Sequence, residues 1–263
     1  MENYPLPVKV VIVSDCTDVA FVEMRAAIAT TFIETLSNIK LSPQIEPLVP
    51  CVPFSLTNAS FLTRLVAETA TPNTLIMVIA NFISERTERI IGRTLKKNLF
   101  FEGTNTGAFG WLMDDFGMQD CYELYDPGFL PFGGKYVHAP AIGKALAGIP
   151  IDVLGTPFPL LKIRRHLPEV GEIVHIDNFG NAKLYIQEIG YSEGEKVLIS
   201  FQDKHVDNIV AVIGKRMMSL PKGTWVIYPG SSLGLFELGQ VRKRGLLDLP
   251  IEVGTKVIIR KCK

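Results

Sequence analysis

The sequence has no excess of charge of either sign and no long apolar run. Among its 263 residues, Lys and Arg together number 27 and Asp and Glu together number 27, so the formal net charge is zero. A nucleic-acid-binding domain usually carries a basic excess or stripe, and the cluster Lys162-Ile163-Arg164-Arg165 is too short to form one. No apolar run reaches the roughly 18 residues that suggest a membrane span. We therefore expect no nucleic-acid partner and no membrane partner.

The cysteines and histidines lack the spacing of metal ligands. Cys16, Cys51, Cys121 and Cys262 lie far apart, and no CxxC pair or Cys/His cluster occurs, so no metal site is expected. The opening segment MENYPLPVKVVIV starts acidic and lacks the basic region and cleavage site of a secretion signal. Reduced thiols without such a signal are typical of a cytoplasmic protein, which is the location we expect.

Two common phosphate-binding patterns are also missing. No GxGxxG follows the first predicted strand, and no GxxxxGK[ST] occurs in the chain. Both patterns use glycine-rich turns to bring backbone N–H groups against phosphate oxygens. Ordinary dinucleotide binding and P-loop nucleotide binding are therefore not indicated.

Strand-like and helix-like patterns alternate through residues 1–160. Helical spacing of apolar residues covers 18–39 and 55–70, with Asp18 and Ser55 as candidate N-caps. Further helices are expected at 107–115 and 140–147. Strands are expected at 9–14, 44–49, 74–79 and 98–101. This alternation predicts an α/β domain with a mainly parallel sheet over residues 1–160.

The pattern changes after about residue 160. The stretch LGTPFPLLKIRRHLPEVGE carries three prolines and no periodicity, which is typical of a linker. Only short strand-like segments follow, separated by Gly, Pro, Asn and Asp: EIVHI, AKLYIQ, KVLISF, NIVAVI, TWVIYP, LGLFEL and TKVIIR. Residues 161–263 are therefore predicted to form an all-β domain, a small barrel or a sandwich, with the barrel preferred.

Polar residues follow two predicted strands of the first domain, at the edge where open parallel sheets bind ligands. Asp15 and Asp18 come after the first strand, and Asn81 comes after the strand at 74–79. A carboxylate such as Asp15 can accept two hydrogen bonds from a vicinal diol, which suits a ribose. Alternatively, Asp15 and Asp18 do no more than cap the next helix. In the second domain, residues 177–181 read DNFGN and form either a plain turn or a polar ligand contact.

Several segments, taken in order, resemble one enzyme family. They are Ser14-Asp15 with the following Asp18, Phe21, Met24 and Arg25; Pro53-Phe54; the turn at 103–107 (GTNTG); the helix start at 137–141 (VHAPA); DNFGN, which resembles a D-x-F-G-N motif; and 230–234 (GSSLG), which resembles a G-S-S-G-x-L turn. Together they resemble the S-adenosylmethionine (SAM)-dependent hydroxide adenosyltransferases, fluorinases and chlorinases. The resemblance covers nearly the whole chain.

The resemblance implies an N-terminal α/β domain, a C-terminal β-barrel and a homotrimer. It places SAM, as substrate or ligand and without a further cofactor, between the N-domain of one subunit and the C-domain of the next. The substrate-binding residues it implies fall into four contacts. Asp15 and Phe54 would lie at the ribose, Asp18 and Asp177 at the methionine moiety and its amino group, Phe179 and Asn181 at the adenine, and Ser231 and Ser232 at the carboxylate.

The sequence departs from the family at the residues that position the attacking water. Where the family has an Asp-Arg-His set, a gapless alignment gives Asn81, Glu88 and Gly133. We therefore expect any catalysis to use Asn81, Ser84 and Arg86, with Arg89 and His138 as further replacements for the missing groups. An anionic nucleophile such as halide ranks last.

Three functions are compatible with this pattern. The first is hydrolysis of SAM at the ribose C5′ to adenosine and methionine. The second is binding of SAM or an adenine nucleoside by a trimer without catalysis. The third is a remodelled nucleophile pocket that acts on a different substrate.

Overall fold

A computed structural model of the chain describes residues 6–37, 41–81, 87–128 and 130–262. The chain divides into two compact units, Met1–His166 and Leu167–Lys263, and each is described by itself. The boundary expected after residue 160 lies a few residues before this division. Among these described residues, no helix is both long and apolar enough to cross a bilayer.

The first unit contains a seven-stranded sheet with the order β2-β1-β3-β5-β4-β6-β7. Its strands are β1 (Lys9–Ser14), β2 (Val49–Pro50), β3 (Thr74–Ile79), β4 (Arg89–Thr94), β5 (Phe100–Thr104), β6 (Met118–Leu124) and β7 (Gly155–Pro157). β1 and β3 have the predicted bounds. The strand predicted at 44–49 is reduced to β2 and an isolated bridge between Val10 and Ile45.

The sheet is mixed rather than mainly parallel, which corrects the expectation. β2, β1, β3 and β5 pair in parallel, whereas β4, β6 and β7 join by antiparallel pairing. The parallel half still places the carboxyl ends of β1 and β3 side by side, because Ser14 is in register with Ile79. The sheet edge at which the sequence predicts a ligand is therefore formed.

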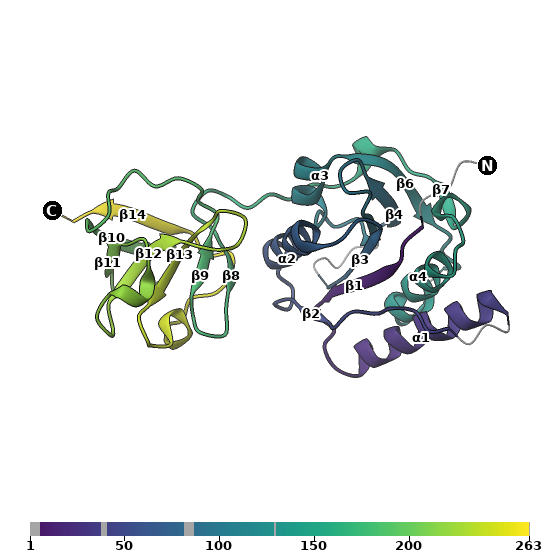
Figure 1. Cartoon of the computed structure of the whole chain (residues 1–263), viewed down its shortest axis with the longest axis horizontal. Helices are drawn as coiled ribbons and strands as arrows, with labels where there is room; N and C mark the ends of the chain where they lie inside the picture. The colour runs from purple at the N-terminus through teal and green to yellow at the C-terminus, as the bar shows by residue number, and fades with distance from the viewer. Residues whose placement is uncertain (1–5, 38–40, 82–86, 129, 263) are drawn as a thin grey trace. The chain divides into compact units, whose positions relative to one another are not determined.

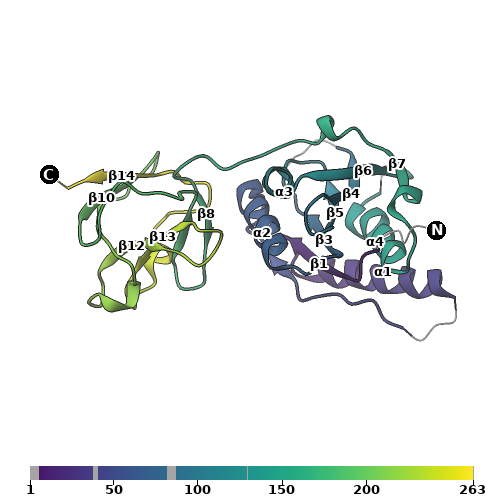
Figure 2. The same cartoon turned by 45° about the horizontal axis from the view of Figure 1, so that its top comes forward.

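Helices cover the sheet of the first unit. They are α1 (Val19–Leu36), α2 (Leu56–Thr69), α3 (Gly110–Phe116) and α4 (Ala139–Leu146), the last preceded by a π-helical turn, η1 (Gly134–His138). α1 lies beside α4, and α2 lies beside α3 (Figures 1 and 2). The predicted N-caps are confirmed: the Asp18 carboxylate accepts a hydrogen bond from the Ala20 N–H, and the Ser55 hydroxyl from the Asn58 N–H.

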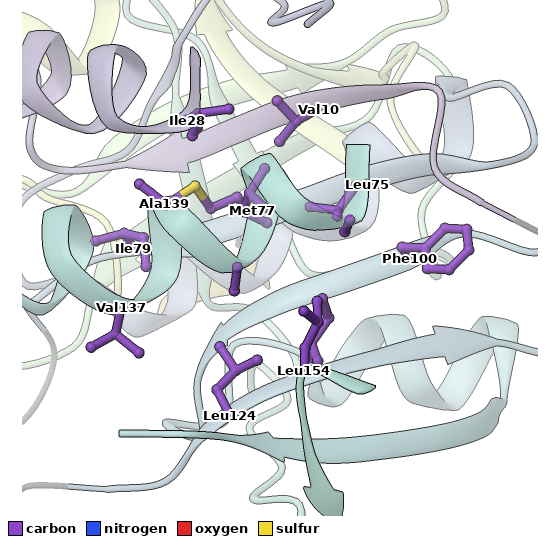
Figure 3. Packing of buried hydrophobic residues seen from close by; sticks show 14 of the residues in the cluster. Val10, Ile28, Leu75, Met77, Ile79, Phe100, Leu124, Val137, Ala139 and Leu154 are labelled. Atoms are coloured by element: carbon purple, nitrogen blue, oxygen red, sulfur yellow. The ribbon is translucent and has the colours of Figure 1, made fainter. Parts of the chain in front are cut away.

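The core of the first unit lies between the sheet and the pair α1 and α4. Ile28 of α1 and Ala139 of α4 are fully buried with Val10 of β1 and Met77 of β3 (Figure 3). The buried positions of α1 are Met24, Ile28 and Phe32, which recur every four residues on one helical face. This packing fixes the edge of the sheet where β1 ends.

The second unit contains a seven-stranded sheet and no described α-helix, as expected for an all-β domain. The order is β14-β10-β11-β12-β13-β9-β8. The strands are β8 (Ile173–Ile176), β9 (Ala182–Leu184), β10 (Lys196–Phe201), β11 (Ile209–Ile213), β12 (Trp225–Pro229), β13 (Phe236–Gln240) and β14 (Val257–Lys261). Short 3₁₀ turns lie at Ile151–Val153 and Leu160–Lys162 in the first unit and at Met217–Ser219 and Gly245–Asp248 in the second.

This sheet curls until its two edge strands meet. The Ile173 N–H donates to the Thr255 carbonyl at 2.9 Å, and the Val257 N–H donates to the Gly171 carbonyl at 2.9 Å. Buried residues of several strands, including Leu184, Ile199 and Leu238, pack inside the curve. The expected small barrel is compatible with this curled sheet.

Candidate functional site

The edge site of the first unit is formed by Asp15, Phe54 and Asn81. Asp15 follows β1 directly, and Asn81 follows β3 after one residue. Phe54 lies in the turn between β2 and α2, and β2 pairs with the end of β1. The parallel register therefore brings together three of the residues that the sequence indicated.

The two carboxylate oxygens of Asp15 are held differently. Oδ2 accepts hydrogen bonds from two backbone N–H groups, those of Asn81 at 3.0 Å and Phe54 at 3.3 Å. Oδ1 is contacted by two side chains, through the Asn81 amide Nδ2 at 3.3 Å and the Cys16 Sγ at 3.6 Å. The backbone thus orients the carboxylate through Oδ2, and Oδ1 is the oxygen best placed to accept a hydrogen bond from a ligand.

The two thiols beside Asp15 are held in the protonated form. Burial and the negative charge of Asp15 raise the pKa of Cys51 to about 12. The same two causes raise the pKa of Cys16. Because the thiolate is the nucleophilic form of cysteine, these residues do not supply a nucleophile near neutral pH.

Asp18 and Phe54 occupy more exposed positions than Asp15. Asp18 is exposed, and its carboxylate caps α1, as one of the two interpretations proposed. The Phe54 side chain is 74% exposed, and its backbone has a positive φ of 60°. Positive φ is uncommon for a bulky residue, so the turn that carries the Phe54 N–H to Asp15 adopts an unfavourable backbone conformation.

Four residues were expected to replace the Asp-Arg-His set of the family: Ser84, Arg86, Arg89 and His138. Ser84 and Arg86 lie outside the described residues. Arg89 forms an ion pair with Asp126, with Nη1 and Oδ2 2.7 Å apart. A Cβ atom on Gly133 would lie 2.6 Å from an Arg89 guanidinium nitrogen, so the guanidinium occupies the space of a side chain at position 133. Sequence reasoning missed Asp126, because its pairing with Arg89 joins distant segments.

His138 is not placed to act at the edge site. It is 2% exposed and its Nδ1 pairs with the carboxylate of Glu102, which is fully buried on β5. Glu102 lies in the interior of the sheet, in register with Met77 of β3 rather than at a strand end. The hypothesis that His138 replaces the family histidine is not supported by this position.

The DNFGN segment is a tight turn between β8 and β9. The Asp177 Oδ1 accepts hydrogen bonds from the backbone N–H groups of Phe179 and Asn181, both at 2.9 Å, and Oδ2 accepts one from the Asn181 amide at 3.0 Å. Phe179 is 67% exposed. Gly180 has φ 83°, and an added Cβ would lie 1.7 Å from the Arg244 carbonyl oxygen, so only glycine fits there.

Asp177 therefore repeats the arrangement of Asp15. In both, one carboxylate oxygen is anchored by two backbone N–H groups, and the other contacts the side-chain amide of one asparagine. In both, the second oxygen retains acceptor capacity.

A row of four polar side chains, here called the polar row, crosses neighbouring strands of the second sheet. His175 of β8 is in register with Lys183 of β9, Lys183 with Glu237 of β13, and Glu237 with Tyr228 of β12. Lys183 Nζ lies 2.5 Å from Glu237 Oε1, and the Tyr228 hydroxyl donates to Glu237 Oε2 at 2.7 Å. Alternation in each strand places these side chains on one face of the sheet, but the row could not be predicted from the sequence, because it depends on the pairing of four separate strands.

Burial and charge perturb the two ends of the polar row. Burial lowers the pKa of His175, and the nearby positive charge of Lys183 adds to this effect. Burial, followed by the hydrogen bond to Glu237 and the negative charges of Glu237 and Asp177, raises the pKa of Tyr228 well above its usual range. At neutral pH, the neutral imidazole and the protonated phenol are therefore the favoured forms.

The loop GSSLG, which contains Ser231 and Ser232, joins β12 to β13. The DNFGN turn adjoins the other end of these strands, because Ala182 pairs with Leu238 and Leu184 pairs with Phe236. The polar row lies between the two loops. The GSSLG loop with Ser231 and the DNFGN turn with Asp177 are therefore at opposite ends of β13. Within the described ranges, no group of three or more His, Cys, Asp or Glu residues could hold a metal ion.

Comparison with known proteins shows a shared fold without an assigned activity. No protein-family model and no curated protein matches the chain. Similar crystal structures include those of an uncharacterized conserved protein from Thermotoga maritima (TM-score 0.78) and a conserved hypothetical protein from Thermus thermophilus (TM-score 0.72). Each is 18% identical, and each match covers 95% of this chain and 99% of the other. At this identity, the likeness extends to the fold alone.

Proposed function

We propose that the protein binds S-adenosylmethionine and hydrolyses it at the ribose C5′ to adenosine and methionine. The observation that carries the proposal is the anchoring of Asp15 at the carboxyl edge of β1 and β3. Its Oδ2 is fixed by two backbone N–H groups, whereas its Oδ1 is contacted by two side chains, the Asn81 amide and the Cys16 thiol. A carboxylate oriented in this way suits the diol of a ribose.

The charge of the ligand suits the site. SAM carries a sulfonium cation, an ammonium group and one carboxylate, so it is cationic at neutral pH. Asp15 and Asp177 both offer carboxylates on the surfaces that the resemblance assigns to SAM. Burying a charged ligand group without a partner is costly, so anchored carboxylates at these positions favour a cationic nucleoside over a phosphorylated one.

The proposed reaction is an in-line displacement. The oxygen of a water molecule forms a bond to C5′ as the bond from C5′ to sulfur breaks. The electron pair of that bond neutralises the sulfonium, and methionine leaves as a neutral thioether. The proton of the attacking water passes to solvent. Asn81 has no basic group, so its part in this scheme is to orient the water and Asp15.

We also propose that the protein is a homotrimer, with Asp15 of one subunit and Asp177 of the next contributing to each site. This assignment follows the resemblance, which places SAM between subunits. Asp15 with Asn81 and Asp177 with Asn181 have matching arrangements, so each of the two carboxylates is oriented before a ligand binds.

Binding without catalysis is the second candidate. It is favoured by the burial of His138 against Glu102 and by the replacement of the family aspartate by Asn81. A trimer that retains Asp15 and Asp177 but lacks a proton acceptor near C5′ would hold SAM intact.

The test is to incubate the purified protein with SAM and to separate adenosine and methionine by chromatography. We expect adenosine to form faster than in a protein-free control and faster than with Asp15→Asn. Asp152→Asn, at an exposed position of the same unit, is the matched control and should retain wild-type activity. Intact SAM with binding detected by calorimetry would select the binding function, and absence of both would exclude the proposed ligand.

A further inference from the structure

Glu237 connects the GSSLG loop to the rest of the polar row. A Cβ atom on Gly230 would lie 2.4 Å from Glu237 Oε1, so the backbone at the start of the loop packs directly against this carboxylate. Oε1 also contacts Lys183, and Oε2 accepts the hydrogen bond from Tyr228. The carboxylate is thus fixed from both sides at the point where it contacts the loop.

The row is buried enough to resist rearrangement. The side chains of Lys183 and Glu237 are 12% and 8% exposed. A buried ion pair is costly to break, because removal of one partner leaves an uncompensated charge. The hydroxyl of Tyr228 satisfies the second oxygen of Glu237, so the carboxylate has a partner on each oxygen.

The same strand supports the DNFGN turn at its other end. A Cβ atom on Gly239 would lie 2.3 Å from the Asn181 Oδ1, so the Asn181 side chain packs against the β13 backbone. The negative charge of Asp177 also contributes to the raised pKa of Tyr228, which indicates that the turn lies near the row. Two residues of β13, Glu237 and Gly239, therefore contact the two loops to which ligand roles are assigned.

We propose that Glu237, held by Lys183 and Tyr228, is a positioning residue that orients the GSSLG loop toward the amino-acid portion of the ligand. This inference rests on the proposed function. Through Ser231, the loop would contact the methionine carboxylate, whereas the nucleoside portion would contact Asn181 and Asp15. Removing a contact that holds Glu237 should therefore weaken binding of SAM. Binding of adenosine, which lacks the amino acid, should be unchanged.

The test compares affinities for SAM and adenosine by calorimetry, with Tyr228→Phe as the first variant. This substitution removes one hydrogen bond and retains the ring and the ion pair. We expect the affinity for SAM to fall roughly three- to tenfold, the loss typical of one hydrogen bond, with the affinity for adenosine unchanged. Tyr191→Phe is the matched control, because the Tyr191 hydroxyl contacts the Ile259 carbonyl at 3.4 Å, within the same unit. The control should change neither affinity.

A second variant tests the same role in case Tyr228→Phe does not fold. The double substitution Lys183→Met and Glu237→Met removes the ion pair as a whole, a change that is often tolerated in protein interiors. It should reproduce the selective loss for SAM at a near-native melting temperature.

The outcomes separate this role from the proposed function. Wild-type protein that binds neither ligand would exclude both the proposed function and this role. Wild-type protein that binds both ligands, with variants that bind SAM equally well or lose both affinities in parallel with stability, would overturn the positioning role alone.

Discussion

At the scale of single residues, the hydrogen bonds of Asp177 show that DNFGN is a turn, and they leave one carboxylate oxygen able to accept a further hydrogen bond. Its Oδ1 is committed to the backbone of the turn, and only Oδ2 retains capacity. The sequence identified the residue types, since this turn has five residues, with a carboxylate at one end and an amide at the other, where the commonest hairpin turn has two. It did not predict that Asp177 and Asn181 would bind each other, because that depends on the conformation of the turn.

Asp177→Ala should therefore lower both the affinity for SAM and the stability of the protein. Affinity for SAM should fall by about 1.5–3 kcal/mol, the value of a charge-assisted hydrogen bond. The free energy of unfolding should fall by about 1–3 kcal/mol, because the N–H groups of Phe179 and Asn181 lose their acceptor. Calorimetry with SAM and denaturant unfolding measure the two effects.

The matched control for Asp177 is Asp207→Ala, which lies at an exposed position of the same unit. It should change neither affinity nor stability. Lowered stability with unchanged affinity for SAM in Asp177→Ala would restrict DNFGN to the role of a structural turn.

At the scale of elements, the sequence was sufficient to predict those helices and strands whose apolar spacing and caps lie within the segment itself. β1, β3, α1 and α2 were predicted from apolar spacing and from the caps Asp18 and Ser55. The strands β4 and β6 were missed, since RIIGRT and MQDCYEL contain charged residues. Arg93 of β4 is buried because Asp120 of β6 lies 2.8 Å away, a partner that only the fold provides. Without these strands, the sheet was expected to be mainly parallel.

The beginning of α1 offers a test of what Asp18 does. Asp18→Ala should lower the free energy of unfolding by about 1 kcal/mol, because it removes the cap from the Ala20 N–H. Asp18→Ser keeps an oxygen acceptor and should retain wild-type stability, with unchanged affinity for SAM. Thermal unfolding and calorimetry check both variants. A selective loss of SAM affinity in Asp18→Ser would instead assign Asp18 to the methionine moiety.

At the scale of the whole molecule, the sequence allowed a division into an α/β part and an all-β part, but it contained no signal for how copies assemble. Assembly depends on surfaces whose partners belong to another chain. The trimer therefore rests on the resemblance alone, and so does the assignment of Asp15 and Asp177 to one shared site. Both can be tested without knowledge of the interface.

Mixing two variants that are each impaired in SAM binding tests this arrangement. If each site takes Asp15 from one subunit and Asp177 from the next, a trimer that contains both Asp15→Asn and Asp177→Ala chains can form an intact site. Equal amounts of the two variants, unfolded and refolded together, assemble at random. In half of the sites the subunit that supplies residue 15 then has the native Asp15, and in half the subunit that supplies residue 177 has the native Asp177. About one quarter of the sites should then be intact, and SAM binding should recover to that fraction of wild type.

Each variant refolded alone is the control, and light scattering measures the assembly. Three copies of the 29.1 kDa chain should give a single species of three times that mass. Recovery in the mixture requires that the two carboxylates of a site belong to different copies. Binding that stays at the level of the separate variants, with trimers present, would mean that each site is completed by residues of a single copy, and the proposed location of the ligand would have to be abandoned.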